Sequence, residues 1–203
     1  MWAYLTLAMG ILTGTSSYLV GPVELDPQAS DWRDMVTEKL ATMGVVVLNP
    51  MKKPKWVGRC LTPQEILTSS FMSGVGGLSK EDALSVQLES RQICLRLVHA
   101  TDWAICYLPK TQTIGSIEEL AILSQRGVQV FFVCKPPISM WLTSMFISRV
   151  EEFQSVFFGN WDALFGHLDE INKGKVPVDP LKWVFLTWNR KGGDNDGTDN
   201  KQA

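Results

Sequence analysis

Histidine and paired cysteine are scarce in this chain of 203 residues, and their scarcity argues against several kinds of site. The two histidines, His99 and His167, form no H-x-x-H or H-E-x-x-H pattern, so a zinc site is not expected. None of the four cysteines belongs to a C-x-x-C pair, and three lie in apolar runs. Such cysteines are typical of reduced thiols in a cytosolic protein. The phosphate-binding motifs G-x-x-x-x-G-K-[ST] and G-x-G-x-x-G are also absent.

The chain also lacks an excess of either charge and lacks a long hydrophobic run. Lys and Arg number 19 and Asp and Glu number 21, which gives a net charge of −2. Without a broad cationic surface, duplex nucleic acid is not expected as a partner. Residues 1–12 are apolar, but they are too short to span a bilayer and have no basic flank. No membrane partner is therefore expected.

What the sequence does contain is an alternation of short apolar runs with helical patterns. Strands are expected at Ser17–Val20, Val45–Leu48, Trp103–Leu108, Val128–Cys134 and Lys182–Trp188. Helices are expected at Asp31–Met43, around 62–70, at Ser79–Ala100, at Ser116–Arg126 and at 160–172. Near-continuous apolar strands separated by helices predict a doubly wound α/β fold of the flavodoxin or Rossmann-like kind. The sheet is expected to be mostly parallel and five-stranded, with helices on both faces.

One α/β domain is expected over residues 16–189, after an apolar N-terminal extension over 1–15. The polar, glycine-rich tail over 190–203 is expected to be disordered. In parallel sheets, ligands bind beyond the carboxyl ends of the strands. The loops expected at that edge are 21–31, 49–62 and 109–116.

Glu119 has two interpretations on spacing alone. Ser116 and Glu119 have the S-x-x-E spacing of a capping box, in which the glutamate caps its own helix. A carboxylate in the first helical turn would also stay ionised beside the helix dipole. At the carboxyl end of a strand, such a group would be an anionic nucleophile.

Six short motifs occur in order over roughly residues 16–172. The first three are Tyr18-Leu19-Val20-Gly21-Pro22, Asp31-Trp32-Arg33 and Val47-Leu48-Asn49-Pro50. The other three are Ala100-Thr101-Asp102, Gly115-Ser116-Ile117-Glu118-Glu119-Leu120-Ala121 and Gly127-Val128-Gln129-Val130. This ordered set resembles the nucleoside 2-deoxyribosyltransferase family, and the W-R and N-P motifs are most similar to its phage-encoded members.

The resemblance implies an enzyme that cleaves the N-glycosidic bond of 2′-deoxynucleosides and transfers the sugar to another nucleobase, with no metal or other cofactor. Glu119 would be the nucleophile that forms a covalent glycosyl intermediate, Tyr18 would orient it, and Asp102 would handle the base and its proton. The substrate-binding residues implied are Gly21, Pro22, Trp32, Arg33, Asn49, Gly115 and Ser116. A cytoplasmic homo-oligomer in nucleotide salvage is expected, with a nucleoside or nucleotide and a free nucleobase as its partners.

Two alternatives stay open. One is a hydrolase that acts on nucleoside 5′-monophosphates, with Arg33 and the basic residues between Lys52 and Arg59 holding the phosphate. The other is a non-catalytic nucleotide-binding or sensor domain. Thr113 favours it, because the family often has an acidic residue at that position. The aromatic stretch from Trp141 to Trp161 is expected in the core or at a dimer surface.

Overall fold

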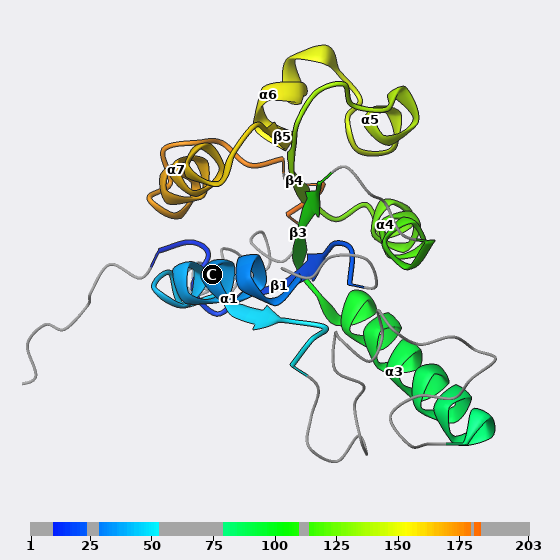
Figure 1. Ribbon diagram of the computed structural model, residues 1–203. Helices are drawn as coiled ribbons and strands as arrows, with labels where there is room; N and C mark the ends of the chain where they lie inside the picture. Colours follow the sequence, from blue (N-terminus) through cyan, green and yellow to red (C-terminus); the bar gives the residue numbers. More distant parts are fainter. Residues whose placement is uncertain (1–9, 24–28, 53–78, 110–113, 180, 184–203) are drawn as a thin grey trace, which may run out of the picture.

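The computed structural model describes residues 10–23, 29–52, 79–109, 114–179 and 181–183 (Figure 1). The helix predicted around 62–70, the tail over 190–203 and most of the predicted N-terminal extension lie outside these residues. Among the described residues, the strands are β1 (Ser16–Val20), β2 (Val46–Leu48), β3 (Trp103–Leu108), β4 (Val130–Cys134) and β5 (Phe157–Phe158). The helices are α1 (Ala29–Ala41), α3 (Lys80–Ala100), α4 (Ile114–Arg126), α5 (Met140–Phe146), η1 (Val150–Glu152), α6 (Phe153–Val156) and α7 (Trp161–Asn172).

The strands form one sheet in the order β2-β1-β3-β4-β5, and every neighbouring pair is parallel. This arrangement confirms the predicted doubly wound α/β fold. The order reverses at β1, since β2 lies on one side of it and β3 on the other. Ligands of such sheets bind beyond the carboxyl ends of the strands at the point where the order reverses. The loops after β1 and β3 therefore border the place where a site is expected.

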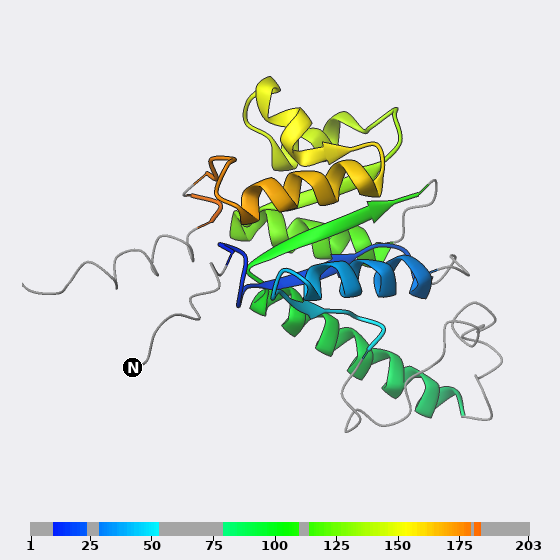
Figure 2. The same ribbon diagram turned by 90° about the vertical axis from the view of Figure 1, so that its left-hand side faces the viewer.

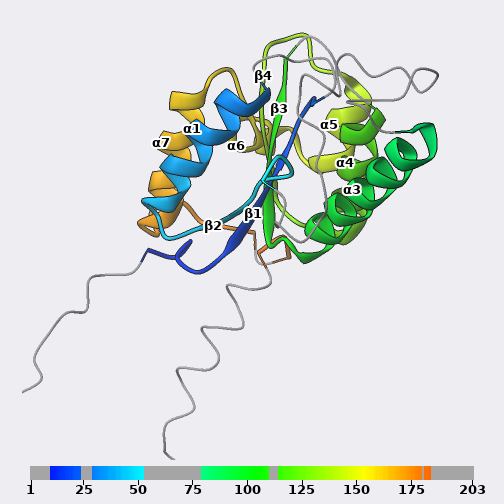
Figure 3. The same cartoon turned by 60° about the horizontal axis from the view of Figure 1, so that its bottom comes forward.

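Helices cover both faces of the sheet (Figure 3). Side chains of a strand alternate between faces, so Leu19 and Ile105 point to one face while Tyr18 and Cys106 point to the other. The first face packs against α1 and α7, which run next to each other in Figure 2. The second face packs against α3, α4 and α5. The core is therefore two apolar layers, one on each side of the sheet.

Local signals set several helix ends where the sequence predicts them. Ser79 caps α3, because its hydroxyl accepts a hydrogen bond from the Asp82 amide at 3.1 Å. Asn160 caps α7 through the Ala163 amide at 2.9 Å. Gly127 ends α4 with a φ of 65°, a left-handed conformation that favours glycine. No described helix is both long enough and apolar enough to cross a membrane.

The fifth strand differs from the prediction. Phe157 and Phe158 form β5 beside β4, whereas Lys182 and Trp183 lie in a turn and in coil. Residues 184–188 lie outside the described residues. Trp183 is 2% exposed, and its ring packs 6.0 Å from the Trp103 ring. The apolar pattern near 183 therefore reflects the burial of Trp183 in coil. The sequence could not predict β5, because a strand of two residues is too short to show a period of alternation.

Candidate functional site

A buried hydrogen bond joins Tyr18 of β1 to Glu119 of α4. The Tyr18 hydroxyl donates to Glu119 Oε1 at 2.8 Å, although the two residues are 101 positions apart in the chain. Tyr18 is fully buried and Glu119 is 8% exposed. Parallel pairing of β1 with β3, and packing of α4 on the same face, bring the two side chains together. The structure thus places two of the three predicted catalytic residues in contact.

Tyr18 is held in its protonated form. Burial is the main cause that raises the pKa of the Tyr18 phenol well above its ordinary value, and the negative charge of Glu119 adds to it. A protonated phenol can donate its hydrogen to the carboxylate. The bond therefore fixes the position of Glu119 Oε1, while the carboxylate keeps its negative charge.

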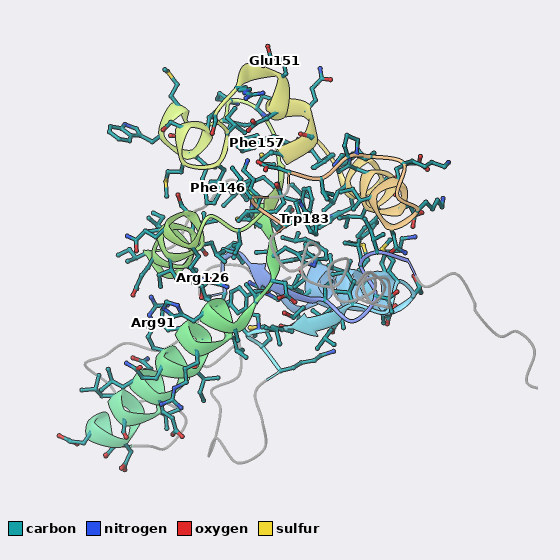
Figure 4. All side chains as sticks on the ribbon, turned by 180° about the vertical axis from the view of Figure 1, so that it is seen from behind. Arg91, Arg126, Phe146, Glu151, Phe157 and Trp183 are labelled. Carbon is teal, nitrogen blue, oxygen red and sulfur yellow. The ribbon has the colours of Figure 1, made fainter. Side chains whose placement is uncertain are left out.

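Arg91 of α3 brings a positive charge to the same place. Arg91 Nη2 pairs with Glu118 Oε2, and Arg91 Nη1 lies 3.9 Å from Glu119 Oε1. The Glu118 side chain is 49% exposed, whereas that of Glu119 is 10% exposed. Figure 4 labels Arg91 on α3, on the face of the sheet that also carries α4. A cation at this distance favours the ionised form of the glutamate.

Two thiols, Cys94 and Cys106, interact with the pair formed by Tyr18 and Glu119. Cys94, which follows Arg91 by about one turn of α3, interacts with the Tyr18 hydroxyl. Cys106 of β3 is fully buried, and its pKa is raised first by burial and then by the charge of Glu119. Among the described residues, no three or more His, Cys, Asp and Glu side chains gather where they could hold a metal ion.

Asp102 lies elsewhere, at the amino edge of the sheet. Its Oδ2 accepts hydrogen bonds from Ser16 N at 2.7 Å and from Ser16 Oγ at 2.8 Å. Burial lowers the pKa of Arg126, and the negative charge of Asp102 opposes this effect. Arg126 lies seven residues beyond Glu119, about 10 Å further along α4. The predicted role of Asp102, handling the base and its proton, does not fit this position, because a residue just before a parallel strand lies at the edge opposite to the carboxyl ends.

Arg33 supports the loop after β1 from inside. It is fully buried, and its Nη2 and Nη1 atoms donate to the Gly21 and Pro22 carbonyls at 2.8 and 3.4 Å. The guanidinium lies 4.3 Å from the centre of the Trp32 ring. A Cβ on Gly21 would stand 2.8 Å from Trp32 Cζ2, so this close packing requires glycine. In the alternative of a 5′-monophosphate hydrolase, Arg33 would hold the phosphate. The structure instead places its buried guanidinium against the carbonyls of this loop.

Other predicted binding residues also have structural roles. Trp32 is 7% exposed and stacks on Trp161 at 5.5 Å between ring centres. Asn49 is 5% exposed, and its Oδ1 accepts from the Met51 amide at 2.9 Å, which closes the turn after β2. Lys52 pairs with Asp34 at 2.8 Å, and the other basic residues of that cluster lie outside the described residues.

The start of α4 differs from the predicted capping box. The helix begins at Ile114, so Ser116 and Glu119 are its third and sixth residues, and its first turn has no acidic residue. Ser116 is 3% exposed within the helix. A Cβ on Gly115 would lie 3.9 Å from Arg91 Nη1, so the glycine borders the charged cluster. Glu119 is not in the first turn, and the Oε1 atom of its side chain bonds to Tyr18 instead.

Sequence reasoning missed Arg91 and Cys94. Both lie on the predicted helix over 79–100, but a helix pattern alone does not say which polar residue faces a distant neighbour.

The fold defines a doubly wound α/β protein whose site joins β1, α3 and α4 on one face of the sheet. The chain matches no known family model and no curated protein.

Proposed function

We propose that this protein is an enzyme that cleaves the N-glycosidic bond of 2′-deoxynucleosides through a covalent glycosyl–Glu119 intermediate and transfers the sugar to another nucleobase. The observation that carries the proposal is the 2.8 Å bond from the Tyr18 hydroxyl to Glu119 Oε1. It supplies a carboxylate that is oriented, largely shielded from water and close to a cation.

The chemistry follows from this geometry. In a retaining glycosyl transfer, a carboxylate attacks the anomeric carbon through an oxocarbenium-like transition state, and the C1′–N bond breaks. The departing base keeps the electron pair of that bond and takes a proton from solvent. A second base then attacks the same carbon, releases the carboxylate and returns a proton to solvent. Tyr18 limits the rotation of Glu119, so the carboxylate does not have to be ordered during the attack. Asp102 has no part in this proposal, because it lies at the amino edge.

Chromatography of reaction mixtures tests the proposal. The purified protein is incubated with each 2′-deoxynucleoside and its 5′-monophosphate, with and without a second free base. A new deoxynucleoside that forms only with the second base supports the transferase. Release of free base regardless of acceptor, chiefly from monophosphates, would replace it with the hydrolase. The absence of product from every substrate would overturn the proposal in favour of a binding domain.

Replacing Tyr18 with phenylalanine is expected to lower kcat by about 100-fold, because the carboxylate loses the donor that fixes its position. KM should change little, since the Tyr18 side chain is fully buried and its hydroxyl bonds to Glu119. Steady-state kinetics on the best substrate of the panel measure both. Tyr107→Phe is the matched control, because that tyrosine points to the other face of β3 and packs on Trp32 at 5.3 Å. An unchanged kcat in Tyr18→Phe would remove Tyr18 from the mechanism.

Replacing Arg33 with methionine is expected to affect folding rather than phosphate recognition. The Gly21 and Pro22 carbonyls lose their donor, which should lower the free energy of unfolding by about 1–3 kcal/mol. The kcat/KM values for a nucleoside and for its 5′-monophosphate should change by the same factor. Thermal melting and the two rate constants check this. A selective loss on the monophosphate would return Arg33 to the binding site and favour the hydrolase.

A further inference from the structure

Two adjacent glutamates on α4 share one arginine, but they share it unequally. Glu118 is the more exposed of the two and pairs directly with Arg91. Glu119 is nearly buried, bonds to Tyr18 at 2.8 Å and lies 3.9 Å from the other terminal nitrogen of Arg91. The guanidinium of Arg91, whose side chain is 29% exposed, thus lies between an outer and an inner carboxylate.

The charges around Glu119 make this arginine important. Tyr18 faces the carboxylate from β1, Cys106 faces it from β3, and Cys94 lies beside Tyr18 on α3. Tyr18 is a phenol, and Cys94 and Cys106 are thiols, so none of the three adds a positive charge. Glu118 adds a second negative charge from α4 itself. Two positive charges bear on these groups: Arg91 lies 3.9 Å from Glu119 Oε1, and the charge of Arg33 acts on Cys106. Arg33 donates to the Gly21 and Pro22 carbonyls, whereas Arg91 also pairs with Glu118. Without Arg91, two carboxylates this close would favour protonation of one of them, and burial would favour Glu119.

We propose that Arg91 is a positioning residue that selects which of the two glutamates attacks. It draws Glu118 outward into an ion pair, and its second nitrogen keeps Glu119 ionised for nucleophilic attack. This inference rests on the proposed function, since it assigns Glu119 the role of nucleophile.

Arg91→Met tests the inference when it is combined with Glu118→Gln. In Arg91→Met, kcat at about pH 6 is expected to fall about tenfold and to recover near about pH 8, where both carboxylates ionise again. The double variant Arg91→Met/Glu118→Gln should regain most of the lost rate at the lower pH, because the competing charge is gone. Arg96→Met is the matched control on an exposed position of the same helix, and it should keep the wild-type profile.

A second readout does not need turnover. Protein labelled with carbon-13 at the glutamate carboxyl reports the titration of Glu119 directly, and loss of the signal in Glu119→Gln identifies it. The midpoint should move to higher pH in Arg91→Met and return in the double variant. If both shifts occur in a protein that turns over no nucleoside, the effect of Arg91 on the charge of Glu119 stands and the proposed reaction fails.

The inference is overturned by two results. One is an Arg91→Met profile that falls equally at all pH values and is not rescued by Glu118→Gln, which would mean a structural role alone. The other is a Glu119 titration that does not move when Arg91 is removed. Either result in an enzyme that still transfers deoxyribose would leave the proposed function intact.

Discussion

Replacing Glu119 with alanine is expected to lower kcat by about 1,000-fold or more, because the variant lacks the carboxylate that we propose as the nucleophile. The same replacement at Glu118 should leave most of the activity, since that side chain is half exposed and bonds to Arg91 rather than to Tyr18. Chromatographic rates for the two variants, measured with the same substrate pair, give the comparison.

The paired variants make this a strict test of the nucleophile. Both positions are neighbours on α4, so a general disturbance of the helix would affect the two in a similar way. Mass spectrometry of the intact protein adds a direct observation, because a trapped deoxyribosyl group should appear on the wild type and not on Glu119→Ala. Equal losses at Glu118 and Glu119 would reject our assignment.

Replacing Trp103 with alanine is expected to lower the free energy of unfolding by about 3–5 kcal/mol, the usual cost of deleting a large buried aromatic side chain. Trp103 is fully buried at the start of β3, with Phe131 at 5.8 Å and Trp183 at 6.0 Å between ring centres. Its indole nitrogen also donates to Thr15 Oγ1 at 3.0 Å. Urea denaturation followed by circular dichroism measures the loss.

Trp103→Phe separates packing from hydrogen bonding in this effect. Phenylalanine keeps part of the apolar contact but leaves Thr15 Oγ1 without its donor, so a smaller loss of about 1–2 kcal/mol is expected. Equal losses for the alanine and phenylalanine variants would show that the hydrogen bond, and not the packing, dominates at this position.

The fold was predictable wherever burial on both faces of the sheet leaves a continuous apolar run. β3 and β4 show this, because every residue of β4 is buried and only Tyr107 of β3 is not. β5 could not be found in this way, since two phenylalanines in an aromatic-rich stretch carry no period. At Lys182 and Trp183 a strand was predicted where the structure has a turn and coil, because a coil segment that packs on the core resembles a strand in sequence.

The site was predictable only in part. The contact between Tyr18 and Glu119 is the relation that the motif resemblance implied. Asp102 and Arg33 have the right residue types, but their environment decides what they do: one bonds to Ser16 at the amino edge and the other is enclosed by the loop after β1. Arg91 carries no motif, and only the packing of α3 against α4 places it beside the glutamates.

The separation of 101 residues between Tyr18 and Glu119 has a consequence for the order of events during folding. Each element of the site can acquire its local structure early, but the bond between these two side chains closes a very long loop. Contacts of such high sequence separation form late, because their chain entropy is lost before the contact contributes. A chain in which β1 has not yet joined β3 therefore lacks the donor that orients Glu119, and the bonded pair of Tyr18 and Glu119 is assembled only when α4 has also packed on the sheet.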